Sequence, residues 1–177
     1  KAALAGSGDF QVSAGPLDRI LLTYPGETWT PGLNDPSFSG NMGVPNSTTA
    51  GGTLHPVEIR AVDPYGNLVA GSRIVTLTCP TGYFFLLDNA NQIIEDHRIT
   101  LNGPATYTIV FRTAGQQHLQ ANVGGIEPST SSAVSVSPNQ YIKLTVVAPG
   151  ETLDPGTFDV DGKLGAPHTQ DAGVPFD

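Results

Sequence analysis

Short runs of alternating hydrophobic and polar residues, separated by turn-forming residues, fill the middle of the chain. In residues 55–63 the side chains of Val57, Ile59 and Ala61 share one face, and residues 105–115 alternate in the same way. A period of two residues is typical of β-strands with one buried face. We find no long run with the 3.6-residue period of a helix, so the pattern predicts an all-β fold.

The alternating runs divide the middle of the chain into about seven or eight predicted strands. Tight turns are expected at residues 64–67 and 89–91, the latter between two strands of one hairpin. This number of short strands in about 124 residues is typical of a β-sandwich. The predicted strands are residues 17–25, 55–63, 72–80, 83–88, 92–99, 105–115, 117–125 and 133–138.

One turn-rich phrase occurs twice in the chain. The sequence YPGETWTPG occupies residues 24–32, and APGETLDPG occupies residues 148–156, which is 124 residues later. The similarity continues toward the N-terminus without a gap, so that residues 10–28 align with residues 134–152. Because the hydrophobic pattern matches as well as the turn residues, we interpret the two phrases as copies in an internal repeat.

The repeat also continues toward the C-terminus and divides the chain into units. After a deletion of two residues, residues 40–52 align with residues 162–174 through shared glycine, proline and alanine positions. We therefore predict the end of one Ig-like unit in residues 1–15, a complete unit in residues 16–139 and the start of a third in residues 140–177. The chain is interpreted as a window of a longer tandem array.

A connection of 29 residues, from Pro25 to Thr53, interrupts the series of short strands. Connections of this length are uncommon in compact domains unless they have a function. Its pattern recurs in the second copy, with Leu153 in place of Trp29, so we expect an ordered loop with an apolar contact. We predict that this loop docks on a neighbouring unit. The predicted contact residues are Trp29, Phe38, Tyr24 and Leu153.

Two segments resemble a known family. IRAVDPYGNLVAGSRIVTLT at residues 59–78 resembles the strand–turn–strand phrase of bacterial Ig-like domains of the invasin/intimin type. ATYTIVFRTAGQQHLQANVGG at residues 105–125 is similar to the closing part of these domains. The resemblance covers about residues 54–138. It implies an Ig-like β-sandwich with a stalk-like or fibre-forming role and no catalysis.

The turn at residues 63–67 has a physical explanation that agrees with the resemblance. The carboxylate of Asp63 can accept hydrogen bonds from backbone N–H groups inside the turn, and Pro64 fixes φ at its first central position. Gly66 or Asn67 can take the left-handed conformation that closes it. We therefore expect Asp63, Gly66 and Asn67 to define the turn.

Composition and charge exclude several functional classes. The 21 glycines and 15 prolines suit a protein with many turns, and 16 acidic residues against 8 basic ones give a net charge of −8. Such a surface repels nucleic acid phosphates and offers no basic patch to anionic lipids. The single cysteine excludes an intrachain disulfide, and no run of 18 apolar residues predicts a transmembrane helix. We predict an extracellular or cell-surface location.

Catalytic chemistry has little support in the sequence. The acidic residues near Asp88 and Asp96, with His97, form either a small acid–base site or the solvated end of a hairpin, and the second interpretation is favoured. No nucleophile elbow of the form G-x-S-x-G occurs, and the four histidines lack the spacing of zinc ligands. Cys79 is interpreted as a small core residue. We predict that the chain is not an enzyme.

Calcium is the best candidate for a bound ion. Extracellular Ig-like arrays can be stiffened by Ca²⁺ at their junctions, and calcium needs six or more oxygen ligands. No D-x-D-x-D-G pattern occurs, and the alternative is an acidic surface that keeps the protein soluble. The weak calcium candidates are Glu27, Asp35, Asp159 and Asp161.

The sequence therefore predicts a structural protein. It would form a segment of an extracellular filament or cell-surface stalk that is built from repeated Ig-like units and whose partners are neighbouring copies or tandem units of itself. An adhesin, or a carbohydrate-binding accessory module of a secreted protein, is the alternative. A planar row of exposed aromatic side chains would favour that alternative.

Overall fold

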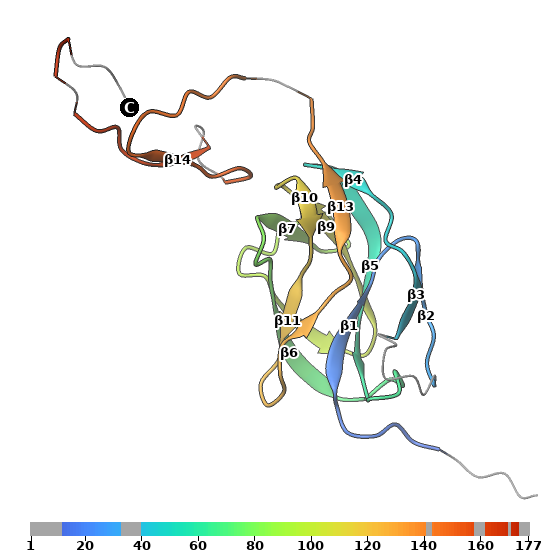
Figure 1. Cartoon of the computed structure of the whole chain (residues 1–177). Coiled ribbons are helices and arrows are strands. Elements are labelled where there is room, and N and C mark those ends of the chain that lie inside the picture. Colours follow the sequence, from blue (N-terminus) through green and yellow to red (C-terminus); the bar gives the residue numbers. More distant parts are fainter. Residues whose placement is uncertain (1–11, 33–39, 141–142, 158–161, 170, 174–177) are drawn as a thin grey trace, which may run out of the picture.

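The computed structural model describes residues 12–32, 40–140, 143–157, 162–169 and 171–173, and the described part is all β (Figure 1). Its first thirteen strands are β1 (Arg19–Thr23), β2 (Glu27–Trp29), β3 (Asn41–Gly43), β4 (Thr48–Thr49), β5 (Thr53–Val62), β6 (Ser72–Thr78), β7 (Phe84–Leu87), β8 (Arg98–Asn102), β9 (Ala105–Phe111), β10 (Gly115–Gln117), β11 (Gln120–Asn122), β12 (Ser129–Thr130) and β13 (Val134–Ser137). Two further strands, β14 (Glu151–Leu153) and β15 (Lys163–Gly165), follow. Among these residues there is no helix of the length and apolarity that crossing a membrane requires.

The first sheet has the strand order β1–β5–β9–β7, and all neighbours are antiparallel. Leu22 of β1 pairs with Ile59 of β5, and the alternate residues of each strand point into the molecule. The predicted inward face of β5 is confirmed, since Val57, Ile59 and Ala61 are all buried.

The second layer consists of two small sheets, β12–β11–β6–β8 and β10–β13–β4. Strand β10 pairs with β13, and β11, which follows it along the chain, pairs with β12. One interrupted hairpin therefore connects the two small sheets. Strand β4 adds to β13 in parallel, with Thr48 opposite Val136. The second layer thus contains a parallel pair at one edge of an otherwise antiparallel arrangement.

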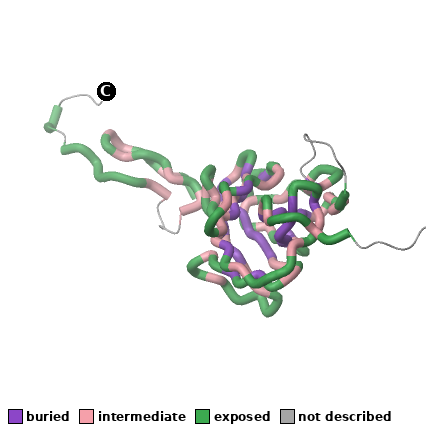
Figure 2. The backbone as a smooth tube through the Cα atoms, turned by 90° about the horizontal axis from the view of Figure 1, so that it is seen from below, coloured by how far each residue is buried: buried purple, intermediate pink, exposed green. Residues whose placement is uncertain are grey.

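The core lies between the two layers, where the buried segments of the chain gather (Figure 2). Its apolar side chains come from both layers, including Ile59 and Ile109 of the first and Val75, Leu77 and Leu119 of the second. Burial of such apolar surface is the main driving force for folding. The predicted Ig-like β-sandwich is confirmed.

The structure has more strands than the seven or eight predicted. Residues 19–137 contain thirteen within the described part of the chain. One cause is that the two strands of the closing hairpin are each divided in two, into β10 and β11 and into β12 and β13. The other cause is that the long connection contributes β2, β3 and β4.

The predicted strand at residues 92–99 is formed only in part. Ile93 makes one antiparallel bridge to Leu87 of β7, so the hairpin around residues 89–91 is present, but the continuous strand begins later and pairs elsewhere. The chain turns at Asp88–Gln92, where Asn91 N donates to Asp88 O, and again at Ile94–His97. His97 has a φ of 50°, which redirects the chain out of the first sheet. Strand β8 then begins at Arg98 and pairs with β6 in the second layer, because the buried alternation belongs to residues 98–102.

The long connection moves the chain between the two layers. Strand β1 pairs in the first sheet, whereas β4 pairs in the second layer. Between them β2 and β3 form a separate antiparallel pair that lies beside β5, outside the sandwich (Figure 1). We call β2–β3 the first hairpin and β14–β15 the second hairpin.

Candidate functional site

A tight turn at Pro25–Gly26 opens the first hairpin. Glu27 N donates to Tyr24 O at 3.0 Å, and Asn46 N donates to Pro25 O at 2.7 Å. Gly26 has a φ of 94°, and a methyl group on it would overlap Val44 O and lie 3.0 Å from Asn46 N. A glycine is therefore required at this position, where the chain before β2 passes close to the chain after β3.

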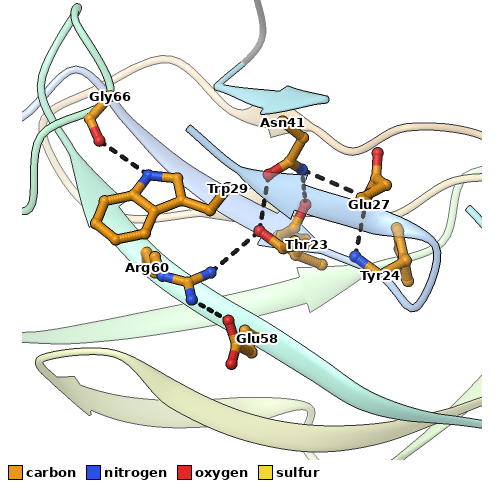
Figure 3. A network of polar contacts seen from close by, with 9 residues as sticks. Thr23, Tyr24, Glu27, Trp29, Asn41, Glu58, Arg60 and Gly66 are labelled. Atoms are coloured by element: carbon orange, nitrogen blue, oxygen red, sulfur yellow. Dashed lines mark hydrogen bonds and ion pairs between the residues drawn. The ribbon is translucent and has the colours of Figure 1, made fainter. Parts of the chain in front are cut away.

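Arg60 lies beneath this hairpin rather than in solvent. The alternation of β5 places its side chain on the outer face, yet only 8% of Arg60 is exposed. The Trp29 ring covers the guanidinium, with Cζ 4.7 Å from the ring centroid, and Trp29 Nε1 donates to Gly66 O at 3.0 Å (Figure 3). The hairpin thus gives the first sheet a second covered face.

The charge of Arg60 is compensated within the same cluster. Its Nη1 donates to Thr23 Oγ1 at 3.1 Å, and its Nη2 forms an ion pair with Glu58. A charge this deeply buried requires such partners, since desolvation without them costs several kcal/mol, about 3 or more. Arg60 is therefore a structural cation that fixes the hairpin to the sheet.

Asn41 joins the first hairpin to the edge of β1. Its Nδ2 donates to Leu22 O at 2.7 Å, and its Oδ1 accepts from Thr23 Oγ1 at 2.8 Å (Figure 3). Glu27 adds a third link, because Oε2 accepts from Tyr24 N at 2.8 Å and Oε1 accepts from Ser132 Oγ at 2.6 Å. Side chains thus replace the backbone pairing that this edge lacks.

The second hairpin has the same register as the first. Glu27 pairs with Gly43 and Trp29 with Asn41 in the first hairpin. In the second, Glu151 pairs with Gly165 and Leu153 with Lys163. The turn is also the same, with backbone hydrogen bonds from residue 151 to residue 148 at 3.0 Å and from residue 168 to residue 149 at 2.7 Å.

Side-chain hydrogen bonds are equivalent in the two hairpins as well. Glu151 Oε2 accepts from Ala148 N at 2.8 Å, as Glu27 Oε2 accepts from Tyr24 N. Lys163 Nζ donates to Val146 O at 3.1 Å, in the place where Asn41 donates to Leu22 O. Lys163 also binds the Glu151 carboxylate, and this hydrogen bond, together with that from Ala148 N, holds the pKa of Glu151 below its usual range.

The segment before the second hairpin differs from its counterpart. Leu144 and Val146 are 78% and 73% exposed, whereas the corresponding residues of β1, Ile20 and Leu22, are each 2% exposed. In the described part of the chain no strand pairs with residues 143–147 as β5 pairs with β1. The same apolar pattern is therefore a buried strand only where a partner strand covers it.

The turn at residues 63–67 forms as the sequence predicts. Asp63 Oδ1 accepts from Tyr65 N and Asn67 N, both at 2.9 Å, and Gly66 has a φ of 77°. Asp63 Oδ2 accepts from Gly15 N at 2.8 Å, at the predicted junction with the preceding unit. Burial by itself would raise the pKa of Asp63, but these hydrogen bonds outweigh it and lower the pKa.

The predicted contact residues of the loop lie in different environments. Tyr24 is 1% exposed and its hydroxyl lies 3.1 Å from Ser131 Oγ, so its prediction as a contact with a neighbour is corrected: it belongs to the core. Trp29 packs on its own sandwich. Leu153 is 64% exposed, and Phe38 lies outside the described residues.

The calcium candidates are not brought together within the described residues. Glu27 uses both carboxylate oxygens for hydrogen bonds to Tyr24 and Ser132. Residues 12–32, 40–140 and the described stretches after them contain no group of three His, Cys, Asp or Glu side chains that could hold a metal ion. Asp35, Asp159 and Asp161 lie outside the described residues, so the calcium site stays a prediction.

The acidic residues around His97 have structural roles. Asp88 Oδ1 accepts from Ala90 N and Gln92 N in one turn, and Asp96 Oδ1 accepts from Arg98 N in the next. The His97 ring stacks on Phe84, with centroids 4.2 Å apart. These contacts agree with the interpretation of the segment as a hairpin end.

The surface of the described residues includes two open depressions. One, of about 640 Å³, is lined by Asp88, Asn89, Ala90, Pro104, Ala105, Thr106 and Tyr107. The other, of about 430 Å³, is lined by Cys79, Pro80, Thr81, Gly82, Tyr83, Thr113, Asp154 and Pro155. The second depression therefore lies where the second hairpin contacts the sandwich. The sequence does not predict this contact, because its residues lie about 40 to 70 positions apart.

Comparisons with known proteins find no matching family model and no matching curated protein. Among solved structures, a glycosyl hydrolase family 2 member from Bacteroides cellulosilyticus has a TM-score of 0.48 at 11% identity over 71% of this chain, and another from strain DSM 14838 has 0.47 at 10% over 70%. Parabacteroides merdae beta-glucuronidase has 0.42 at 14% over 67%. This chain spans 15%, 15% and 12% of those chains, and likenesses with TM-scores below 0.5 assign it no function.

Proposed function

We propose that this protein is a segment of an extracellular filament or cell-surface stalk built from repeated Ig-like units. The observation that carries the proposal is the equivalence of the two hairpins. They share strand register, turn hydrogen bonds and a carboxylate that accepts from the backbone N–H three positions before it. Two copies of one irregular element in one chain are the signature of a repeat architecture.

The exposed apolar residues before the second hairpin support the same proposal. Leu144 and Val146 correspond to core residues of β1, and exposure of such side chains is unfavourable by about 1.5–3 kcal/mol each. A following unit would cover them with its own first sheet. Residues 140–177 would then begin that unit, and its partners are further units of the same kind.

The way the polar side chains are used supports a mechanical rather than a catalytic role. The polar groups described above are used in turns and in the attachment of the hairpin to the sheet. Such contacts make a unit stiff, and the resemblance to invasin-type domains suggests a rod that projects from a surface. We therefore propose that the chain has no catalytic activity of its own.

Electron microscopy of the native material tests this proposal. Strand β5 has ten residues and is about 33 Å long at about 3.3 Å per residue. We expect thin filaments or rods with an axial spacing of about this length or somewhat more for each unit. Dispersed compact particles at every concentration would contradict the proposal.

A second candidate function, an adhesin or a carbohydrate-binding accessory module, is favoured by the depression beside Asp88, Asn89 and Tyr107. Sugars are bound by a few polar groups together with an aromatic face. A glycan array probed with the chain tests this candidate, with Asn89→Ala as a variant that removes one polar group from the depression. If the parent chain binds a glycan and Asn89→Ala binds it more weakly, the candidate is supported. If the parent chain binds no glycan on the array, the candidate is excluded.

A further inference from the structure

The tip of the second hairpin rests on the sandwich that precedes it. Tyr83 Oη donates to Asp154 Oδ2 at 2.9 Å, and Thr113 Oγ1 donates to Pro155 O at 3.0 Å. Arg112 Nη2 donates to Thr157 O at 2.9 Å. Three side chains from two neighbouring segments of the sandwich thus bind three of the four residues 154–157.

The corresponding tip of the first hairpin lies elsewhere. Gly32, the counterpart of Gly156, donates its backbone N–H to Tyr65 O at 2.7 Å, in the turn that also holds Gly15. This turn is at the end of the sandwich where the chain enters. A hairpin tip therefore lies at the entry end of its own unit, which is the end that faces the unit before it.

We propose that Tyr83, Arg112 and Thr113 form a docking site for the hairpin tip of the following unit, so that each hairpin clamps the junction between two units. The inference rests on the proposed tandem function and names the partner surface. The hairpin tip would bind its own entry turn, as Gly32 does, and the exit end of the unit before it, as Pro155 and Thr157 do.

The fit at Gly156 is close enough to make this contact specific. Gly156 has a φ of 89°, and a methyl group on it would overlap Thr113 Oγ1 and lie 3.0 Å from the carbonyl carbon of Arg112. A side chain at this position would therefore separate the tip from the sandwich. The equivalent methyl group at Gly32, with a φ of 81°, meets no atom of the described residues within 4 Å.

The sandwich side of the contact is held in position by its own packing. The guanidinium carbon of Arg112 lies 5.1 Å from the centroid of the Phe85 ring, which orients Arg112 toward the tip. Thr113 Oγ1 accepts from Tyr83 N at 3.1 Å while donating to Pro155 O. Arg112 N also donates to Tyr83 O at 2.8 Å, so hydrogen bonds within the sandwich connect the three docking residues.

Cys79 provides a reporter for this contact. It lines the same depression as Asp154 and Pro155, and it is the single cysteine of the chain. Cys79 is half-buried, and separation of the hairpin tip would remove one wall of the depression and make the thiol more accessible. A change in the rate at which a maleimide labels Cys79 in the full chain therefore reports a change in docking of the tip.

The decisive comparison is Gly156→Ala against Gly32→Ala in the full chain. Both changes place a side chain at a positive φ, but only Gly156→Ala introduces an overlap with the sandwich. Loss of one hydrogen bond corresponds to about a fivefold change in the ratio of docked to open states. We expect Gly156→Ala to raise the labelling rate of Cys79 by about fivefold or more, and Gly32→Ala to leave it unchanged.

Tyr83→Phe is the second variant, because it removes only the hydroxyl that binds Asp154 at the surface. We expect it to raise the labelling rate in the same direction. Equal rates for the parent chain, Gly156→Ala and Tyr83→Phe would overturn the docking site, even if microscopy shows tandem rods. The opposite combination is also informative. If microscopy shows only compact particles but Gly156→Ala still raises the labelling rate of Cys79, the tandem function is overturned and the contact remains.

Discussion

The guanidinium of Arg60 lies 4.7 Å from the centre of the Trp29 ring, so a cation on the outer face of a sheet is covered by an aromatic side chain from a separate hairpin. The two residues are 31 positions apart and belong to elements that share no backbone pairing. The attachment of the hairpin therefore depends on side chains. This dependence leads to the first two predictions.

Trp29→Ala should lower the free energy of unfolding by about 2–3 kcal/mol, because it removes apolar cover and leaves Arg60 partly uncompensated. Leu153→Ala is the matched control at the equivalent position of the second hairpin. Leu153 is exposed, so its change should stay within about 0.5 kcal/mol. Urea denaturation followed by circular dichroism measures both, and equal effects would contradict the proposed role of Trp29.

Thr23→Val should destabilise the sandwich by about 1–2 kcal/mol, because Thr23 Oγ1 accepts from Arg60 and donates to Asn41. Valine keeps the shape and removes both hydrogen bonds. Thr28→Val on the exposed surface of the first hairpin is the control and should have little effect. Midpoints of urea denaturation measure the change, and unchanged stability in Thr23→Val would show that these two hydrogen bonds do not stabilise the fold.

Acid should destabilise the sandwich through Asp63. The folded state holds the pKa of Asp63 below the unfolded value of about 3.9, because the charged carboxylate accepts several hydrogen bonds. Its contribution is therefore complete above about pH 4 and is lost as the pH falls through the folded pKa. Asp63→Asn should cost about 1–3 kcal/mol at pH 7.

The difference between the parent chain and Asp63→Asn should become smaller below about pH 4, where the carboxylate is protonated first in the unfolded chain and, at lower pH, in the folded chain. Thermal unfolding measured between acid and neutral pH gives this difference directly. A difference that stays constant across the range would contradict the predicted linkage between Asp63 and stability.

Tyr83 should titrate above the ordinary tyrosine value. Its hydrogen bond to Asp154 raises the pKa, since loss of the phenol proton would break that bond beside a carboxylate. Asp154→Asn should move the pKa of Tyr83 back toward about 10. Ultraviolet titration, with Tyr83→Phe to assign the transition, measures the change, and identical titration curves for the parent chain and Asp154→Asn would show that the contact does not persist in solution.

Several features could be predicted from local sequence. The inward face of β5 follows from its alternation, and the turn at residues 63–67 follows from an aspartate, a proline and a glycine at fixed positions. The two similar phrases predicted that residues 24–32 and 148–156 are copies of one element, although not that each copy forms a hairpin. Each of these depends on residues within a few positions of one another, or on direct comparison of two segments.

Other features could not be predicted, because they depend on partners far along the chain. Alternation indicates which residues share a face, but it does not indicate what covers that face or which strand lies beside it. Alternation places Arg60 on the outer face of β5, and only the position of the first hairpin shows that this face is covered at Arg60. The strand predicted at residues 92–99 pairs with β7 only at Ile93, and the continuous strand β8 pairs with β6.

The two copies of the repeat separate the two kinds of information most clearly. The sequence by itself determined that residues 24–32 and 148–156 are copies of one element and that their turn glycines stand at equivalent positions, because these are short-range patterns along the backbone. Only the tertiary structure decided that Ile20 and Leu22 form a buried strand while Leu144 and Val146 remain exposed. The physical reason is that a strand is completed by hydrogen bonds and apolar cover from another strand, which its own residues do not supply.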